Sequence, residues 1–127
     1  MSRKSNLKQY KTISNGNMAS SITSPVTNIE FLDNIGVQLN FTGSPSGNFQ
    51  VQLSIDYNQD NNGNVISAGN WTPIYFSDPR IAGTNIPPAL GSPIYLDLNQ
   101  LSAPWIRIVY TGGGSGTLNA FIAAKML

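Results

Sequence analysis

The sequence of 127 residues contains no cysteine and no histidine. Without thiols or imidazoles, the chain can form neither disulfides nor cysteine- or histidine-ligated metal sites, and it cannot use these groups in catalysis. Charged residues are also scarce, at 10%, against about 25% in an average domain. A polar surface with so few charges repels its own copies only weakly, which suits a protein that packs beside other subunits. We therefore expect the fold to be stabilised by side-chain packing or by assembly.

Long apolar runs are missing as well. No stretch approaches the roughly 20 apolar residues of a membrane-spanning helix. No apolar segment follows the basic start of the chain, as it would in a secretion signal. Neither a membrane protein nor classical export is therefore expected, and the length indicates a single domain with its own core.

The few charges are distributed unevenly along the chain. Residues 1–28 hold four basic residues and no acidic one, whereas residues 29–127 hold three basic and six acidic residues. Residues 1–28 also show no sustained apolar period and are rich in Ser, Asn and Thr, which is typical of a segment without a core of its own. We predict an extended, basic N-terminal arm over residues 1–28 and a body over residues 29–127. The arm would lie on a neighbouring subunit or fold back on its own body, and its deletion should leave a folded body.

Apolar and polar residues alternate in two neighbouring stretches, which predicts two β-strands. "IGVQLNFT" begins at Ile35, and "FQVQLSIDY" runs from Phe49 to Tyr57. The residues expected to point inward are Ile35, Val37, Leu39 and Phe41 in the first strand, and Phe49, Val51, Leu53, Ile55 and Tyr57 in the second. The loop "GSPSG" between them carries the Gly and Pro of a tight turn. We therefore predict a hairpin with one solvated face.

The second half of the chain repeats this β pattern without a helical period. In "WTPIYF", Pro73 cannot donate to a sheet and predicts an edge strand, and the Pro-rich segment 77–93 predicts a long loop. "IYLDLNQL" alternates again, with Ile94, Leu96 and Leu98 inward. "WIRIVYT" and "TLNAFIAAKM" flank "GGGSG" and predict a second hairpin, whose first strand is apolar on both faces and should be covered on each side. The fold class is therefore all-β, a single antiparallel β-sandwich of jelly-roll-like form with about six to eight strands.

Motifs for catalysis or metal binding are weak. "DYNQDNNGN" spaces Asp56 and Asp60 as acids are spaced in calcium loops, but such a loop also needs a glycine at its sixth place and a bidentate acid at its twelfth, and the closing acid is missing here. "GGGSG" lacks the lysine and helix that follow a phosphate loop. No acid pair or nucleophile motif indicates a reaction. We expect no enzymatic activity, no cofactor and no metal.

Residues that bind a partner are expected in two places. In the arm they are Arg3, Lys4, Lys8, Tyr10 and Lys11, and in the body they are Arg80, Trp71 and Trp105. Aromatic residues could also form a platform on which a sugar or base stacks, although such residues at alternating positions are also common as core and interface anchors. The candidates for this platform are Trp71, Tyr75, Tyr95, Trp105 and Tyr110. Four arm cations could neutralise only a few phosphates, so nucleic acid is not an expected partner.

Residues 35–125 as a whole resemble small phage-encoded virion proteins. The resemblance lies in "FQVQLSIDY", "WTPIYF" and "IYLDLNQLSAPWIRIVYTGGGSGTLNAFIAAK", which contain an Asp-Leu-Asn-Gln-Leu turn, an aromatic-Ile-Arg strand and a Gly-rich segment leading into "GTLNA". It implies a structural part of a virus particle, such as a capsid decoration protein or a tail or portal fitting. The segment 1–28 lies outside the similar region, so its partner is not implied.

Together, the residues and the resemblance predict a non-enzymatic bacteriophage virion protein, a decoration or cement protein that stabilises the capsid through arm and loop contacts. It would be homo-oligomeric, with a trimer as one candidate, and would bind the major capsid protein or other virion subunits. Two alternatives stay open. One is a glycan-binding module for host attachment, with Trp71 or Trp105 stacking on a sugar, and the other is a tail- or portal-associated fitting.

Overall fold

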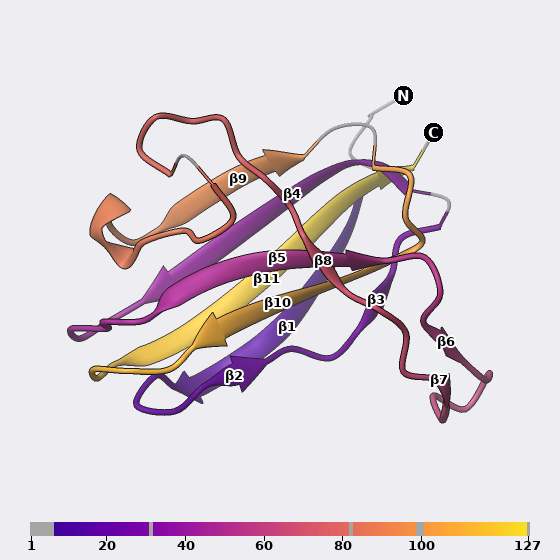
Figure 1. The fold of residues 1–127 in the computed structure, drawn as a ribbon, viewed down its shortest axis with the longest axis horizontal. Coiled ribbons are helices and arrows are strands. Elements are labelled where there is room, and N and C mark those ends of the chain that lie inside the picture. Colours follow the sequence, from indigo (N-terminus) through magenta and orange to yellow (C-terminus); the bar gives the residue numbers. More distant parts are fainter. Residues whose placement is uncertain (1–6, 31, 82, 99–100, 127) are drawn as a thin grey trace.

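The computed structural model describes residues 7–30, 32–81, 83–98 and 101–126, which form two antiparallel β-sheets packed face to face (Figure 1). Sheet A has the order β1 (Leu7–Asn17), β11 (Thr117–Met126), β4 (Leu32–Phe41), β9 (Ile94–Leu98). Sheet B has the order β2 (Ile22–Thr23), β10 (Trp105–Thr111), β5 (Asn48–Ser54), β8 (Thr72–Pro73), and β3 (Thr27–Asn28) also pairs with β10. A small hairpin of β6 (Asn58–Gln59) and β7 (Val65–Ser67) projects at one corner, and Pro88–Leu90 form one 3₁₀ turn. No helix in the described ranges is long and apolar enough to cross a membrane.

The β2 and β3 segments act as one interrupted strand. Both pair with β10, and Ser24 lies in the interruption between them. The Ser24 hydroxyl accepts a hydrogen bond from the Ile108 N–H at 2.9 Å, and the Ser24 N–H donates to the Ile108 carbonyl at 2.8 Å. The side chain thus satisfies a backbone group of β10 that would otherwise be buried without a partner.

The strand order is that of a jelly roll. With β2 and β3 counted as one strand, each sheet has four strands and the sandwich has eight. The first strand then pairs with the eighth, the second with the seventh, the third with the sixth and the fourth with the fifth, as in a long double strand wrapped around a barrel-like core. This confirms the predicted antiparallel, jelly-roll-like sandwich.

Both predicted hairpins are wrong in their pairing. β4 lies in sheet A and β5 in sheet B, while β10 lies in sheet B and β11 in sheet A. The loops "GSPSG" and "GGGSG" therefore each carry the chain across the sandwich. The two loops instead pair with each other at one end of the molecule. Thr42 N–H donates to the Thr117 carbonyl at 3.1 Å, and Ser46 N–H donates to the Gly113 carbonyl at 3.1 Å. Alternation identifies which face of a strand is buried, but it carries no information on which strand is its neighbour.

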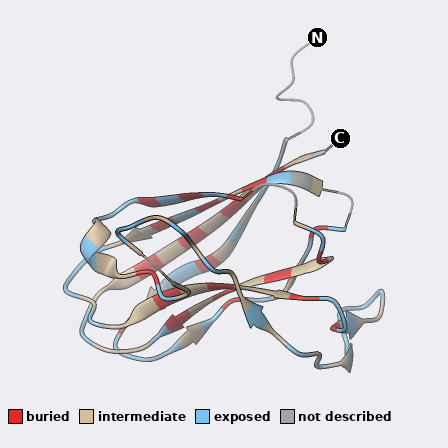
Figure 2. Cartoon of the chain, turned by 45° about the horizontal axis from the view of Figure 1, so that its top comes forward, coloured by how far each residue is buried: buried red, intermediate tan, exposed pale blue. Residues whose placement is uncertain are grey.

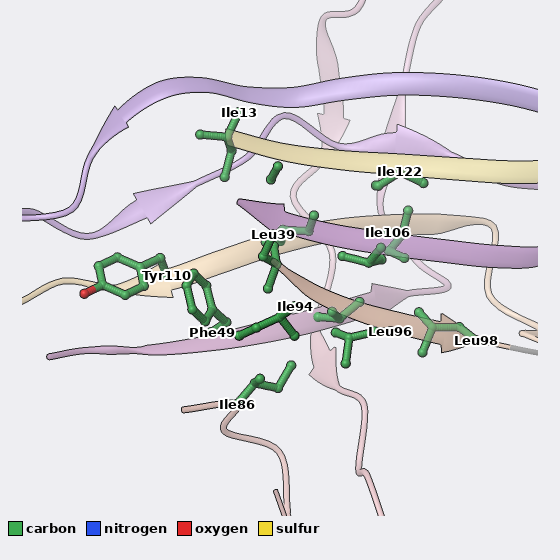
Figure 3. Close-up of a cluster of buried hydrophobic side chains, with 14 of the residues drawn as sticks. Ile13, Leu39, Phe49, Ile86, Ile94, Leu96, Leu98, Ile106, Tyr110 and Ile122 are labelled. Atoms are coloured by element: carbon green, nitrogen blue, oxygen red, sulfur yellow. The ribbon is translucent and has the colours of Figure 1, made fainter. Parts of the chain in front are cut away.

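The core fills the space between the sheets, and burial alternates along the strands as predicted (Figures 2 and 3). The fully buried side chains include Ile35, Val37 and Leu39 of β4, Phe49 and Val51 of β5, Ile106, Ile108 and Tyr110 of β10, and Leu118 and Ile122 of β11. The three inward residues predicted for β9, Ile94, Leu96 and Leu98, are also buried. β8 lies at the edge of sheet B, as Pro73 predicts.

The second predicted strand ends earlier than expected. β5 stops at Ser54, so Ile55 is 75% exposed, and Tyr57 is buried outside the core. The Ser54 hydroxyl accepts a hydrogen bond from the Tyr57 N–H at 3.1 Å, and this local bond turns the chain out of the sheet.

The prediction of an extended N-terminal arm is wrong for residues 7–28. These residues form β1, β2 and β3, which pair with the strands β11 and β10 of their own body. Ile13 and Met18 enter the core with at most 5% of their surface exposed. A few apolar residues, spaced irregularly because β1 contains register shifts, are enough to anchor the segment, although they leave no periodic signal in the sequence. The boundary predicted at residue 28 is therefore not a boundary in the structure, and residues 1–6 lie outside the described residues.

Candidate binding surfaces

The arm residues predicted to bind a partner do not form one basic patch. Arg3 and Lys4 lie outside the described residues. Tyr10 is opposite Ile122 and packs against the core, which gives it a structural role. Lys11 is exposed, and its ammonium lies 5.5 Å from the ring centroid of Phe121 on the outer face of sheet A. Lys8 is also exposed on β1, the edge strand of this sheet, where lysines discourage pairing with a foreign strand.

Arg80 forms an ion pair with Asp78 in its own turn. Its guanidinium lies 2.9 Å from the carboxylate of Asp78, and its N–H donates to the same carboxylate. This pairing lowers the pKa of Asp78 and raises the pKa of Arg80. Arg80 is therefore a weaker candidate for an external partner than its exposure suggests.

The two predicted tryptophans come together on the outer face of sheet B. Trp105 begins β10, Trp71 directly precedes β8, and Tyr57 lies between them. The ring centroid of Tyr57 is 5.0 Å from that of Trp105 and 5.6 Å from that of Trp71. The Trp71 indole N–H donates to the Ala68 carbonyl at 3.1 Å, which fixes its orientation. We call Tyr57, Trp71 and Trp105 the aromatic cluster.

Arg107 extends this cluster and is the residue that sequence reasoning missed. Its guanidinium carbon lies 4.2 Å from the ring centroid of Trp71, and its Nε donates to the side-chain oxygen of Gln52 at 2.8 Å. Gln52 in turn donates to Gln50 at 2.9 Å, and Gln50 donates to Asn85 at 2.7 Å. The side chain is thus held on one side by an aromatic face and on another by a chain of carboxamides.

The guanidinium of Arg107 has no acidic partner among the residues that the structure describes. Partial burial disfavours its charged form and lowers its pKa, although an arginine stays protonated at neutral pH. The signal in the sequence was the spacing: Trp105 and Arg107 are two residues apart on one strand and therefore share a face.

A second surface lies on the opposite side of the molecule, on the outer face of sheet A. A depression of about 240 Å³ crosses all four strands. It is lined by Gln9, Gly36, Gln38, Asn40, Tyr95, Phe121, Ile122 and Ala123. Its most exposed aromatic residue is Tyr95, which is 64% exposed. Among the aromatic residues expected to stack on a ligand, Tyr95 thus lines a depression, whereas Tyr110 is fully buried.

The acids of the 56–70 segment stabilise their own turns. Asp60 accepts hydrogen bonds from the N–H groups of Asn62 and Asn64 and from the Asn64 side chain, and Asp56 accepts two from Asn70. These bonds lower the pKa of both carboxyl groups, with Asn64 the main cause for Asp60 and Asn70 for Asp56. Across the described part of the chain, no three acidic side chains gather as metal ligands would. The two carboxylates therefore hold the turns of their own segment in place.

Comparison with known proteins identifies the fold but no family. No protein-family model and no curated protein matches the sequence. Among solved structures, the chain is similar to the SPBc2 prophage-derived protein YomS, with a TM-score of 0.51, 9% identity, and coverage of 94% of this chain and 95% of YomS. It is also similar to part of latent PorU from Porphyromonas gingivalis, with a TM-score of 0.42, 13% identity, and coverage of 94% of this chain but 12% of PorU. A prophage-encoded protein therefore shares this fold over nearly its whole length.

Proposed function

We propose that this chain is a non-enzymatic structural protein of a bacteriophage virion, and that it decorates the capsid by docking the outer face of sheet B onto another virion subunit. The jelly-roll fold is common in viral capsid proteins, and the similarity to a prophage-derived protein spans both chains almost completely. A fold hosts many functions, however. The aromatic cluster with the unpaired Arg107 is the observation that carries the proposal.

This surface has the composition of an interface centre. Trp, Tyr and Arg are the residues most enriched among those that dominate binding energies between proteins, and here they gather around β10. Pockets of the described chain lie on other surfaces, and the aromatic cluster offers a broad surface for a protein. The long side chains are already fixed by stacking and hydrogen bonds, which lowers the entropy lost on docking.

Arg107 indicates the chemistry of the partner. A guanidinium that is fixed through its Nε and its planar face can still donate through its terminal nitrogens, and a carboxylate can accept two such bonds at once. We therefore propose an acidic side chain of the partner as the group that contacts Arg107. Repetition of this contact over many capsid sites would stabilise the particle more than any single contact. The homo-oligomer expected from the sequence stays a prediction, which sedimentation of the purified protein would measure.

The test is a loading experiment with particles of the phage whose genome encodes this chain, assembled without this gene. Wild-type protein should bind at a fixed number of copies per particle. Trp71→Ala and Arg107→Gln should each weaken binding by about 30-fold, the effect of losing a dominant interface residue. Arg80→Gln is the matched control, because it removes an exposed arginine whose charge Asp78 already balances.

Two outcomes would contradict the proposal at different points. If mass spectrometry of purified virions finds no copy of the chain, the virion role is wrong. If Arg107→Gln loads as well as Arg80→Gln, the protein belongs to the particle but docks through another surface.

A further inference from the structure

The depression on the outer face of sheet A arises from the register of its strands. Gln9, Ala123, Gly36 and Asp97 face outward in one row across the sheet, because each is paired with the next. The small Ala123 and Gly36 in the middle of this row leave a low floor. The neighbouring row contains Phe121, Gln38 and Tyr95, whose longer side chains form a wall.

Tyr95 lies against the backbone of this floor. A β-carbon added to Gly36 would stand 3.0 Å from the Tyr95 ring. The glycine therefore gives the tyrosine room to lie over the sheet. The Cε1, Cζ and hydroxyl atoms of the ring approach the backbone of Gly36, while 64% of the residue's surface remains exposed. An aromatic ring that is seated against a rigid sheet and still open to solvent can stack on a ligand with little further loss of side-chain entropy.

The polar groups of the depression are neutral carboxamides. Gln9, Gln38 and Asn40 supply them, and each carboxamide can donate and accept hydrogen bonds. The side-chain amide of Gln38 donates to the side-chain oxygen of Asn40 at 3.0 Å, which orients both side chains. The residues that line the depression include no acid and no base. The exposed Asp97 lies beside the floor on β9 without lining it, and Lys11 lies over Phe121.

This combination indicates the ligand by its chemistry. A ligand that fits must offer an apolar face to a tyrosine ring and several groups that both donate and accept hydrogen bonds to carboxamides. It should also be uncharged, because the lining offers no charged side chain to pair with. A neutral pyranose ring meets all three conditions, since its axial C–H groups form an apolar face and its hydroxyls surround the rim. A nucleotide or acidic sugar would instead place its charge where the lining has no cation to pair with it.

We propose that the outer face of sheet A binds a neutral pyranose unit of a glycan, with Tyr95 stacking on the sugar ring and Gln9, Gln38 and Asn40 bonding to its hydroxyls. This moves the sugar site expected from the sequence away from Trp71 and Trp105, which are engaged with Arg107 and Tyr57 on the other sheet. The two outer faces point in opposite directions, because sheets A and B pack through their inner faces (Figure 1). A copy docked to a particle by sheet B would therefore present the depression to its surroundings.

The test uses the full chain labelled with ¹⁵N and titrated with methyl glycosides of glucose, galactose, mannose and N-acetylglucosamine. At least one sugar should shift the backbone amides of Gly36, Gln38 and Tyr95 in a saturable way. Tyr95→Ala should weaken that binding at least about tenfold, as expected for the loss of one stacked ring. Tyr95→Phe, which keeps the ring, should preserve most of it. Tyr75→Ala is the matched control, since Tyr75 is 70% exposed and lies outside the depression.

A second variant keeps the tyrosine and changes only the glycine beneath it. Gly36→Val should lift the Tyr95 ring from the sheet and weaken sugar binding as Tyr95→Ala does. The inference is overturned if no neutral glycoside shifts these amides at high millimolar concentration, or if Tyr95→Ala binds as tightly as Tyr75→Ala. Selective binding of a sialylated or uronic acid sugar would overturn it too. Tyr95→Ala should load onto particles like the wild type, so failure here is separate from failure of the docking surface on sheet B.

Discussion

At the scale of single residues, Tyr110 shows how a buried polar group can join two loops. Its hydroxyl donates to the Gly113 carbonyl at 2.7 Å and accepts from the Gly47 N–H at 3.0 Å. Gly47 and Gly113 belong to the two loops that cross between the sheets. The approach is close: a β-carbon on Gly47 would lie 1.6 Å from the Thr111 carbonyl oxygen. An aromatic residue that the sequence offers as a stacking candidate therefore serves the fold, because its register on β10 points it inward.

Tyr110→Phe should destabilise the protein by about 1–3 kcal/mol, because the Gly47 N–H would lose its partner in a largely buried place and the Gly113 carbonyl would keep only its bond from the Ser46 N–H. Urea denaturation followed by tryptophan fluorescence measures this change. Tyr75→Phe is the control, since Tyr75 is 70% exposed and a surface change of this kind should stay within about 0.5 kcal/mol. Equal stability of the two variants would show that the phenol does not hold the loops.

At the scale of elements, the sequence predicts strands and their buried faces well, and pairing poorly. The inward faces of β4, β9 and β10 follow directly from alternation, as does the edge position of β8 from Pro73. The prediction that β10 is covered on both faces holds only on the inner side, because the outer side chains Trp105 and Arg107 are only half-buried and contact Tyr57 and Trp71 at the surface. Neighbouring strands in the sequence were expected to pair, but the jelly roll places them in opposite sheets.

The hairpin β6–β7 is the element whose structure depends most directly on ionised carboxylates. Hydrogen bonds lower the pKa of Asp60 and Asp56, so their bonds to the turns stabilise the segment above the ordinary value of about 3.9. This contribution is lost as the pH falls through the lower pKa of the folded state. The protection of the Asn62, Asn64 and Asn70 amides, measured as the exchange rate relative to that of an unfolded chain at the same pH, should therefore fall below about pH 4, while amides of β10 keep their protection.

The matched variant is Asp60→Asn, which retains an oxygen acceptor but does not titrate. In this variant the amides of Asn62 and Asn64 should be less protected than in the wild type at neutral pH, and their protection should no longer fall with acid. An acid-induced loss of protection that is identical in both proteins would mean that another group controls the turn.

At the scale of the whole molecule, residues 7–28 are part of the sandwich. The sequence suggested an arm because residues 7–28 carry few apolar residues and much Ser, Asn and Thr, and these few enter the core only through irregular register. The same reasoning limited the binding surfaces. Trp71 and Trp105 could be named from the sequence, and spacing places Arg107 on the face of Trp105. The contact of Arg107 with Trp71 and the depression beside Tyr95, however, depend on which strands lie side by side.

Deletion of residues 1–28 should therefore prevent folding, in contrast to the folded body expected from the sequence. It removes β1, β2 and β3, takes Ile13 and Met18 from the core, and exposes the edges of β10 and β11. We expect insoluble protein, or soluble protein without cooperative thermal unfolding. Deletion of residues 1–6 is the control, because it leaves every described strand in place. A cooperative transition for the longer deletion would contradict the structural role of β1.

The place of β11 between β1 and β4 has a consequence for biosynthesis. While the ribosome is still making residues 117–126, the strands on either side of this gap have nothing to bridge them, and sheet A cannot close. Nascent chains would thus carry unsatisfied strand edges until residues 117–126 have been made, the condition under which β-rich chains fold slowly and associate wrongly. Overproduction at low temperature, or alongside chaperones that shield such edges, should then raise the yield of native protein more than any change to the surface would.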